Sequence, residues 1–197
     1  MNYEEAAAFW TEKDKTAVKV PEAELRNAIE DFIKARNTCA LAIADGDFVR
    51  CTPLTYKYRN GKFVIFSEGG LKFRALRKNK HAALAIYDEY KGPGSAKSLQ
   101  VTGIATVLGA DDADYAAQLT ALGINAAHMQ QLRLTLILIT PQTLEYLDAA
   151  LKKQGYSPRQ TLQIPWHTTG GVARGFRATP PVLIQQSLKK YGLCAQM

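Results

Sequence analysis

The hydrophobic period of the chain changes near Thr38, and this change constrains the fold more than any other feature of the sequence. From there to residue 148, short apolar segments with the two-residue period of β-strands alternate with turn sequences. Asp45–Gly46–Asp47 and Asn60–Gly61 are typical of hairpin turns, because Asn and Gly readily adopt positive φ. Many strands joined by short turns predict a closed or nearly closed antiparallel barrel. The predicted strands are Thr38–Ala44, Phe48–Arg59, Lys62–Ser67, Ala82–Tyr87, Leu99–Leu108, Leu132–Thr140 and Thr143–Asp148.

Two helices are predicted before the strands. The first covers Asn2 to about Thr11 and is expected to bury Phe9 and Trp10. Pro21 suits the first turn of the second helix, where its missing N–H costs nothing. That helix is expected to stop near Asn37, and its apolar residues recur at helical spacing: Leu25, Ile29, Phe32 and Ile33.

Residues 1–150 are expected to form one domain and residues 151–197 a tail. Within the first range, one further helix is predicted over Asp111–Leu122, with Asp111 or Asp112 as its cap. The tail is rich in loop sequences, with a short helix predicted over Val182–Tyr191. We expect it to pack over the barrel or a partner subunit, because several of its apolar residues are costly to leave in water: Ile164, Trp166, Phe176, Val182 and Leu183.

Composition excludes several classes of protein. No apolar run in the 197 residues approaches the roughly 18 that a membrane span needs, and the acidic, alanine-rich start does not resemble a secretory signal. Cys39, Cys51 and Cys194 cannot pair completely and lack metal-ligand spacing. A cytoplasmic protein without a metal site is therefore expected.

The net charge of +7 favours an anionic partner. A phosphorylated cofactor or substrate is one such partner, and a nucleic acid is another. No recognised nucleic-acid-binding module is present, so sequence-specific recognition of DNA or RNA is not expected. The positive charge is densest at Lys72, Arg74, Arg77, Lys78 and Lys80.

The segment from Arg50 to Lys72 carries the clearest functional signal. Pro53 interrupts a predicted strand, which indicates an edge strand or a bulge, or a place where freed backbone groups bond a ligand. Arg50 lies three residues earlier and would leave the opposite face of an ideal strand, although a bulge at Thr52–Pro53 would change that register. Gly69–Gly70 then precedes a basic helix, a pattern typical of phosphate binding or of a hairpin end followed by a solvated helix.

These residues resemble the FMN-binding split barrel of the pyridoxamine 5′-phosphate oxidase family over roughly residues 28–148. The resemblance implies a six-stranded antiparallel split β-barrel with flanking helices, forming a homodimer with FMN at the interface. It implies that Arg50 and Lys72 hold the FMN phosphate, and that Gln100 reaches the flavin across the interface. The remaining implied contacts to the flavin fall on Cys51, Thr52, Pro53, Phe66 and Ser67. As bare residues, Gln100 is an ordinary strand side chain and Cys51 a small packing residue.

Three departures from the family pattern concern the substrate. Thr55 stands where the oxidases carry a lysine for the substrate phosphate, and Leu71 stands near the place of a second basic residue. Their arginine-rich, tryptophan-ended C-terminal motif has no counterpart in Val172–Met197. The chain is therefore interpreted as a relative that retains the flavin site and lacks the vitamin-phosphate site.

Three functions remain open on the sequence alone. The first is an FMN-dependent oxidoreductase acting on a small organic molecule, with the cofactor carrying the hydride and no side chain required as a general acid or base. The second is a non-catalytic flavin protein for sensing, storage or electron transfer. The third is a relative that binds heme or a deazaflavin, with His81, His128 or His167 as a candidate heme ligand.

Overall fold

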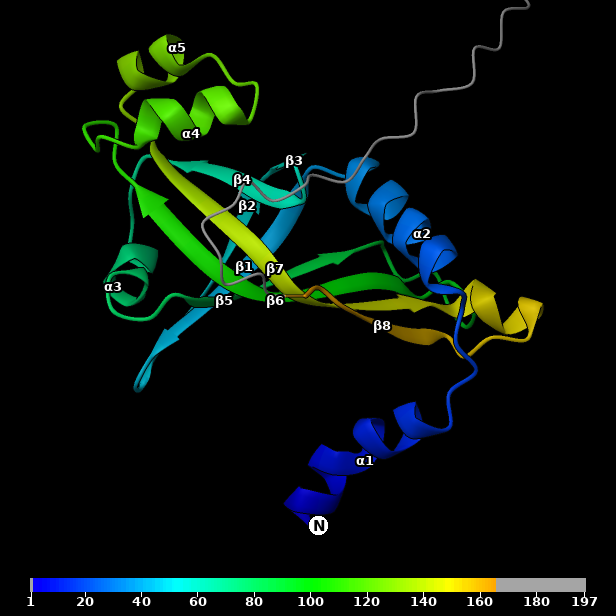
Figure 1. Ribbon diagram of the computed structural model, residues 1–197. Helices are drawn as coiled ribbons and strands as arrows, with labels where there is room; N and C mark the ends of the chain where they lie inside the picture. Colours follow the sequence, from blue (N-terminus) through cyan, green and yellow to red (C-terminus); the bar gives the residue numbers. More distant parts are fainter. Residues whose placement is uncertain (1, 166–197) are drawn as a thin grey trace, which may run out of the picture.

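The computed structural model describes residues 2–165, which form a curled antiparallel sheet flanked by helices (Figure 1). The order across the sheet is β2-β1-β5-β6-β7-β4-β3, and β8 pairs with β7 beside this path. Trp166, Phe176, Val182, Leu183 and the helix predicted over Val182–Tyr191 lie outside the described residues. The strands are β1 (Thr38–Asp45), β2 (Phe48–Thr55), β3 (Lys57–Arg59), β4 (Lys62–Ser67), β5 (His81–Tyr87), β6 (Lys97–Leu108), β7 (Thr135–Asp148) and β8 (Arg159–Gln163).

Tyr56 explains why the sheet curls. It alone separates β2 from β3 in the chain, yet these strands lie at opposite ends of the sheet order. The sheet must therefore bend until its two ends approach, which gives the open half-barrel. Buried Tyr56 fixes the bend by donating its N–H to the Asn37 carbonyl and its hydroxyl to the Ile33 carbonyl, both at 2.8 Å.

The predicted split-barrel class is confirmed. Counting β2 and β3 as one bent strand gives the six predicted strands, and β8 is an addition within the described chain. The two strands predicted before and after Pro141–Gln142 are a single strand, β7, whose register with β6 shifts at that point. The short helical turn η1 (Ala149–Gln154) then leads from β7 towards β8.

The core lies on the inner face of the curled sheet. On β1, Cys39, Leu41 and Ile43 are buried and alternate with less buried alanines, as a two-residue period requires. Helix α2 (Glu22–Lys34) packs onto this core with the predicted residues, Leu25, Ile29, Phe32 and Ile33. Full burial of side chains of this size contributes about 1.5–3 kcal/mol each, so α2 is an integral part of the barrel. Pro21 stands just before the helix, at its N-cap.

A second, smaller core lies under α4 (Tyr115–Ala121) and α5 (Ala126–Gln131). Val64 of β4 and Leu136 and Leu138 of β7 meet the buried side chains of Tyr115, Leu119 and Leu122. These strand positions alternate with the residues of the main core, so the two cores occupy opposite faces of β4 and β7. Figure 1 shows α4 and α5 together beyond one end of the sheet.

The predicted cap of the Asp111–Leu122 helix is wrong, because α4 begins later, at Tyr115, with Asp114 as its N-cap residue. Asp112 instead accepts a hydrogen bond from the Gly109 N–H at 2.6 Å, and Asp111 pairs with Arg133 at 2.6 Å. Both carboxylates therefore stabilise the turn before the helix.

The predicted burial of Phe9 and Trp10 is also wrong for the described part of the chain. They are 48% and 53% exposed, and helix α1 (Tyr3–Lys15) buries none of its residues. Their rings contact each other edge to face at 5.1 Å. Figure 1 shows most of α1 extending away from the sheet, and Trp10 meets only the edge of the sheet, where the Arg159 guanidinium of β8 lies 4.9 Å from its ring centre.

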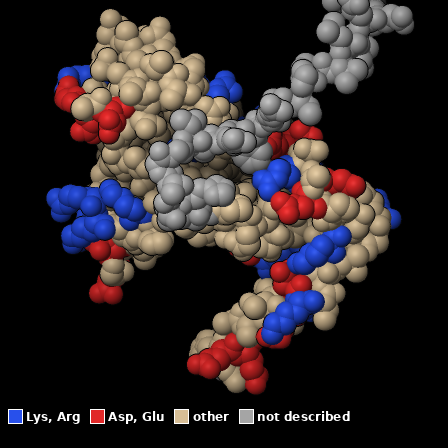
Figure 2. All heavy atoms as spheres, in the orientation of Figure 1, with Lys and Arg blue, Asp and Glu red and all other residues tan. Residues whose placement is uncertain are grey.

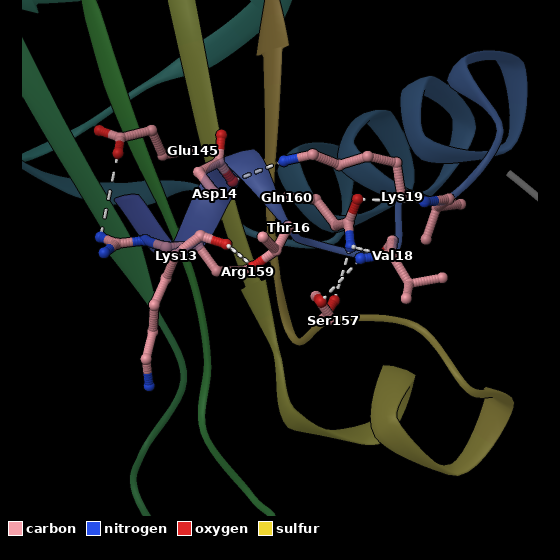
Figure 3. Close-up of polar contacts among 10 residues, drawn as sticks. Lys13, Asp14, Thr16, Val18, Lys19, Glu145, Ser157, Arg159 and Gln160 are labelled. Carbon is pink, nitrogen blue, oxygen red and sulfur yellow. Dashed lines mark hydrogen bonds and ion pairs between the residues drawn. The ribbon is translucent and has the colours of Figure 1, made fainter. Parts of the chain in front are cut away.

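Gln160 attaches that segment to β8 (Figure 3). Its side chain is fully buried, accepts from the Val20 N–H at 3.1 Å, and donates to the Val18 carbonyl at 3.1 Å and the Ser157 carbonyl at 2.6 Å. Ser157 makes two further bonds with Val18, each at 3.0 Å: its hydroxyl oxygen accepts from the Val18 N–H, and its own N–H donates to the Val18 carbonyl. Residues 17–20, which we call the strap, are thus held by a strand about 140 residues away.

Gly103 allows the backbones of β6 and β7 to approach closely where their register shifts. A Cβ at this position would overlap the Thr140 carbonyl oxygen and lie 3.1 Å from Ile139 Cγ2. Pro141 lies opposite Gly103 and has no N–H to donate to the ladder. The next residue of β7, Gln142, has no partner residue on β6, so β7 bulges here.

We therefore expect Gly103→Ala to lower the free energy of unfolding by about 1–3 kcal/mol, the usual cost of forcing a methyl group into a packed site. Urea denaturation followed by circular dichroism measures this. Gly109→Ala is the matched control, because its added Cβ would meet Asp112 Oδ2 at an ordinary 3.6 Å. Equal stability of the two variants would show that the close approach at Gly103 is not restrictive.

Candidate cofactor site

The candidate site begins where β4 turns into α3 (Lys72–Leu76). Gly69 and Gly70 make this turn with φ of 156° and 107°, conformations that L side chains rarely adopt. Leu76 is buried, whereas Leu71 is 59% exposed. Because α3 has only five residues, its dipole is short, and anion binding here depends on side chains.

Lys72 is a buried cation without an acidic partner among residues 2–165. It is 6% exposed, its ammonium donates to the Gly69 carbonyl, and its Nζ lies 5.1 Å from the centre of the Phe73 ring. Burial lowers the pKa of Lys72 below its ordinary value, and the positive charge of Arg50 lowers it further. A bound anion would offset both effects.

Arg50 supplies the second cation. It lies on β2 opposite the buried Ile43, so its side chain projects from the inner face of the sheet. Its guanidinium forms no hydrogen bond or ion pair with the rest of the described chain. The β1–β2 register runs without interruption, so the suggested bulge at Thr52–Pro53 is wrong, and Arg50 and Pro53 are on opposite faces.

Arg74 extends the positive surface next to Arg50. Its guanidinium lies 4.7 Å from the centre of the Phe48 ring, and Phe48 shares the inner face of β2 with Arg50. Figure 2 shows the basic side chains gathered over α3. Only part of this charge is neutralised, since Lys78 pairs with Asp45 at 3.1 Å while Arg74 has no acidic partner in the described range. The sequence showed the charges but not the stacking of Arg74 on Phe48, which depends on two separate elements.

Ser67 fixes the Gly69–Gly70 turn that precedes Lys72. It is 6% exposed and shares the inner face of β4 with Ile65. Its hydroxyl accepts from the Gly69 N–H at 3.3 Å and donates to the Gly69 carbonyl at 3.1 Å. The same carbonyl accepts from Lys72, so Ser67, the glycine turn and Lys72 form one connected unit.

Of the other predicted site residues, only Thr52 lies on the same face of β2 as Arg50. Thr52 shares the inner face with Arg50, whereas Cys51 and Pro53 occupy the outer face of β2. Gln100 is exposed on that outer face, in one row with Pro53 but three strands away, or about 14 Å at the usual strand spacing. Phe66 packs against the small core under α4 and α5. Gln100 and the two cations thus face opposite sides of the sheet.

The backbone of β2 is the remaining feature of the site. In the sheet order β2 is an end strand that pairs only with β1, so its other edge has no partner among the described strands. Backbone N–H and C=O groups along this edge are free to bond the polar rim of a flat ligand. Pro53 lies in this end strand, where a missing N–H is tolerated.

The cysteine and histidine side chains of the described residues do not form a second candidate site. Burial raises the pKa of Cys39 to about 12, so this thiol is inert, and Cys51 is exposed. His81 and His128 are both exposed, and His167 lies outside the described residues. Across residues 2–165, no three His, Cys, Asp or Glu side chains come together as a metal site. None of the described helices is long and apolar enough to cross a membrane.

Two solved structures share this fold. A Clostridium acetobutylicum protein of the pyridoxinephosphate oxidase family, related to general stress protein 26, is 14% identical with a TM-score of 0.52; the match covers 74% of this chain and 97% of that one. General stress protein 26 from Bacillus anthracis is 14% identical with a TM-score of 0.50, covering 71% and 98%. A FAD-binding protein from Mesorhizobium loti is 21% identical with a TM-score of 0.46, covering 60% and 89%.

The family comparison is more decisive than these likenesses. No curated protein matches the sequence. Residues 25–148, more than half of the chain, match the family model described as pyridoxamine 5′-phosphate oxidase. This range runs from within α2 to the end of β7 and contains both cations and the glycine turn. The chain therefore belongs to the pyridoxamine 5′-phosphate oxidase family.

Proposed function

We propose that this protein binds FMN and acts as an oxidoreductase on a small organic molecule. One observation supports the proposal above the others: Lys72 is buried, and the positive charge of Arg50 acts on it. Neither side chain has an acidic partner in residues 2–165. Two like charges held together are unfavourable unless an anion lies between or beside them. The dianionic phosphate of FMN meets that need, and family membership makes a flavin the expected ligand.

Each residue has a defined part in this proposal. Arg50 and Lys72 neutralise the phosphate, and Ser67 adds a hydrogen bond by rotating its hydroxyl away from the Gly69 carbonyl. The backbone of Cys51–Pro53 bonds the rim of the flavin ring along the free edge of β2. When bound, FMN supplies the hydride chemistry, so the protein needs mainly to hold and orient the reactants.

The same proposal requires a homodimer. Gln100 is on the outer face, away from Arg50 in its own protomer, so it can complete the site only as Gln100 of the partner subunit. The outer face suits close approach by a second copy, because its rows across β1 and β5 are built from small side chains: Ala40, Ala42, Ala83 and Ala85. We place this dimer in the cytoplasm.

Turnover with a reductant tests the catalytic part of the proposal. The FMN-loaded protein is mixed with NADH or NADPH, and a quinone or an aromatic nitro compound is added as acceptor. We expect oxidation of the nicotinamide that depends on both the protein and the acceptor. Tight FMN binding without such turnover would contradict an enzymatic role and favour a flavin carrier or sensor.

FMN affinity should fall at alkaline pH because of Lys72. Burial and the charge of Arg50 lower the pKa of Lys72, so its ammonium loses a proton at a lower pH than an ordinary lysine. Phosphate attraction needs the protonated form, and the affinity should therefore decrease as pH rises through this lowered pKa. Flavin fluorescence titrations between pH 7 and about pH 10 measure the decrease. Lys72→Met should remove it, and an unchanged profile in that variant would assign the titration to another group.

A further inference from the structure

A second group of cations surrounds a hollow of about 240 Å³ between β3 and the turn that joins α4 to α5. We call it the α4–α5 hollow. Three of its seven lining residues are basic and none is acidic. The lining includes Lys57, Arg59, Gly123, Asn125, His128 and Met129. None of these residues belongs to the flavin site.

The strand period places these charges on one side. Lys57 and Arg59 are two residues apart on β3, so both side chains leave the same face, while Tyr58 between them packs against the main core. Arg59 pairs with Lys62 in the β3–β4 register, so a third cation lies directly opposite it. Like charges directly opposite each other on neighbouring strands are destabilising.

Little in the described chain compensates for this charge. The Arg59 side chain makes one long hydrogen bond, to the Tyr58 carbonyl at 3.4 Å, and the side chains of Lys57 and Lys62 have no hydrogen-bonding or ionic partner within residues 2–165. Other cations of the barrel are paired: Lys97 with Asp148 at 2.8 Å, and Arg133 with Asp111. The hollow thus concentrates positive charge that the fold leaves uncompensated.

Both walls of the hollow are fixed by side-chain hydrogen bonds. Asn60, at the hairpin turn with φ of 51°, donates its side-chain amide to the Ala121 carbonyl at the end of α4, at 2.9 Å. On the other wall, the Asn125 side chain accepts from the His128 N–H at 3.1 Å and fixes the start of α5. The cations are therefore presented on a preorganised frame, which reduces the entropic cost of binding.

We propose that the α4–α5 hollow binds the phosphate group of a small ligand. Arg59 provides a planar guanidinium suited to two phosphate oxygens, Lys57 adds a point charge, and His128 adds a ring N–H donor. The occupant is small, because a volume of about 240 Å³ is below that of ordinary ligand pockets. This site is independent of the flavin, and its occupancy would relieve the repulsion along the β3–β4 hairpin.

Backbone NMR titration of the full chain tests the proposal. The titration is done in the background of Arg50→Ala with Lys72→Met, so that the flavin phosphate site cannot contribute. Inorganic phosphate is added at constant ionic strength, with sodium chloride as the balancing salt. We expect saturable shifts of the Gly123, Asn125 and His128 amides. Shifts that do not saturate, or that chloride reproduces, would overturn the proposal.

Arg59→Ala should weaken this phosphate binding roughly 10- to 100-fold, as expected for loss of a charge-assisted contact. Lys153→Ala is the control, because it removes the same charge from an exposed position on η1. Equal phosphate affinity of the two variants would contradict the site. A parallel titration with glycerol 3-phosphate separates the sources: tighter binding than phosphate assigns a phosphate monoester, and equal binding assigns free phosphate.

Discussion

Lys72→Met should weaken FMN binding roughly 10- to 150-fold, which corresponds to the loss of a charge-assisted hydrogen bond of about 1.5–3 kcal/mol. Methionine keeps most of the volume of the buried lysine stem, so the packing around Phe73 and Leu76 should be preserved. Removing a buried cation that lacks an acidic partner among the described residues should not lower stability. The variant thus separates binding from folding.

Arg50→Ala should weaken FMN binding to a similar extent, because it removes the other proposed phosphate contact. It should leave the fold intact, because the Arg50 side chain is exposed. Combined with Lys72→Met it should reduce FMN binding below detection in an ordinary fluorescence titration. Lys153→Ala changes the net charge by the same amount at a remote exposed position and should leave the affinity unchanged. Wild-type affinity in both Arg50→Ala and Lys72→Met would show that the phosphate binds elsewhere.

The largest effect on stability is expected at Gln160. Gln160→Leu removes three hydrogen bonds at a fully buried position. The Val20 N–H and the Ser157 carbonyl lose these partners, whereas the Val18 carbonyl keeps its bond from the Ser157 N–H. Each unsatisfied buried group costs about 1–3 kcal/mol. Partial relaxation of the strap offsets some of this, and we expect a net loss of about 2–5 kcal/mol. At 2–4 °C per kcal/mol for a chain of this size, the Tm should fall by about 4–20 °C.

Gln163→Leu provides the matched comparison, with the same substitution on the same strand. Gln163 is exposed and makes one side-chain contact, with the Thr143 hydroxyl at 2.9 Å. Thermal unfolding should therefore change by less than about 2 °C, because an exposed substitution is usually worth under 0.5 kcal/mol. If Gln160→Leu is equally mild, the strap is not stabilised by its attachment to β8.

The barrel was predictable from the sequence because its signals are local. Alternation of Cys39, Leu41 and Ile43 with alanines sets the inner face of β1, and the Asn60–Gly61 turn sets the β3–β4 hairpin. The apolar face of α2 follows from helical spacing alone. Such features depend on neighbouring residues and on side-chain period, both of which can be read from a single chain.

The features that the sequence did not predict depend on contacts between distant segments. Gln160 pairs with the strap about 140 residues before it, and no local pattern marks that contact. The exposure of Trp10 follows from where the strap directs α1. No local pattern marks Gly103 either, since the carbonyl of Thr140 on β7 is what makes a glycine necessary there.

The candidate site was predicted in the same uneven way. The proximity of Arg50 and Lys72 followed from the resemblance to the family, and the structure places both charges close enough for Arg50 to lower the pKa of Lys72. The face of β2 from which Arg50 projects could not be decided from the sequence, because a bulge at Thr52–Pro53 would have changed its register relative to Pro53.

The cofactor that the protein carries as purified decides whether it is an FMN protein. Its absorption spectrum is recorded, the protein is denatured, and the released molecule is identified by mass. We expect FMN to be released and to give bands at roughly 370 and 450 nm, or a colourless preparation to take up added FMN tightly. A colourless protein that does not take up FMN, or one that carries heme, would contradict this expectation.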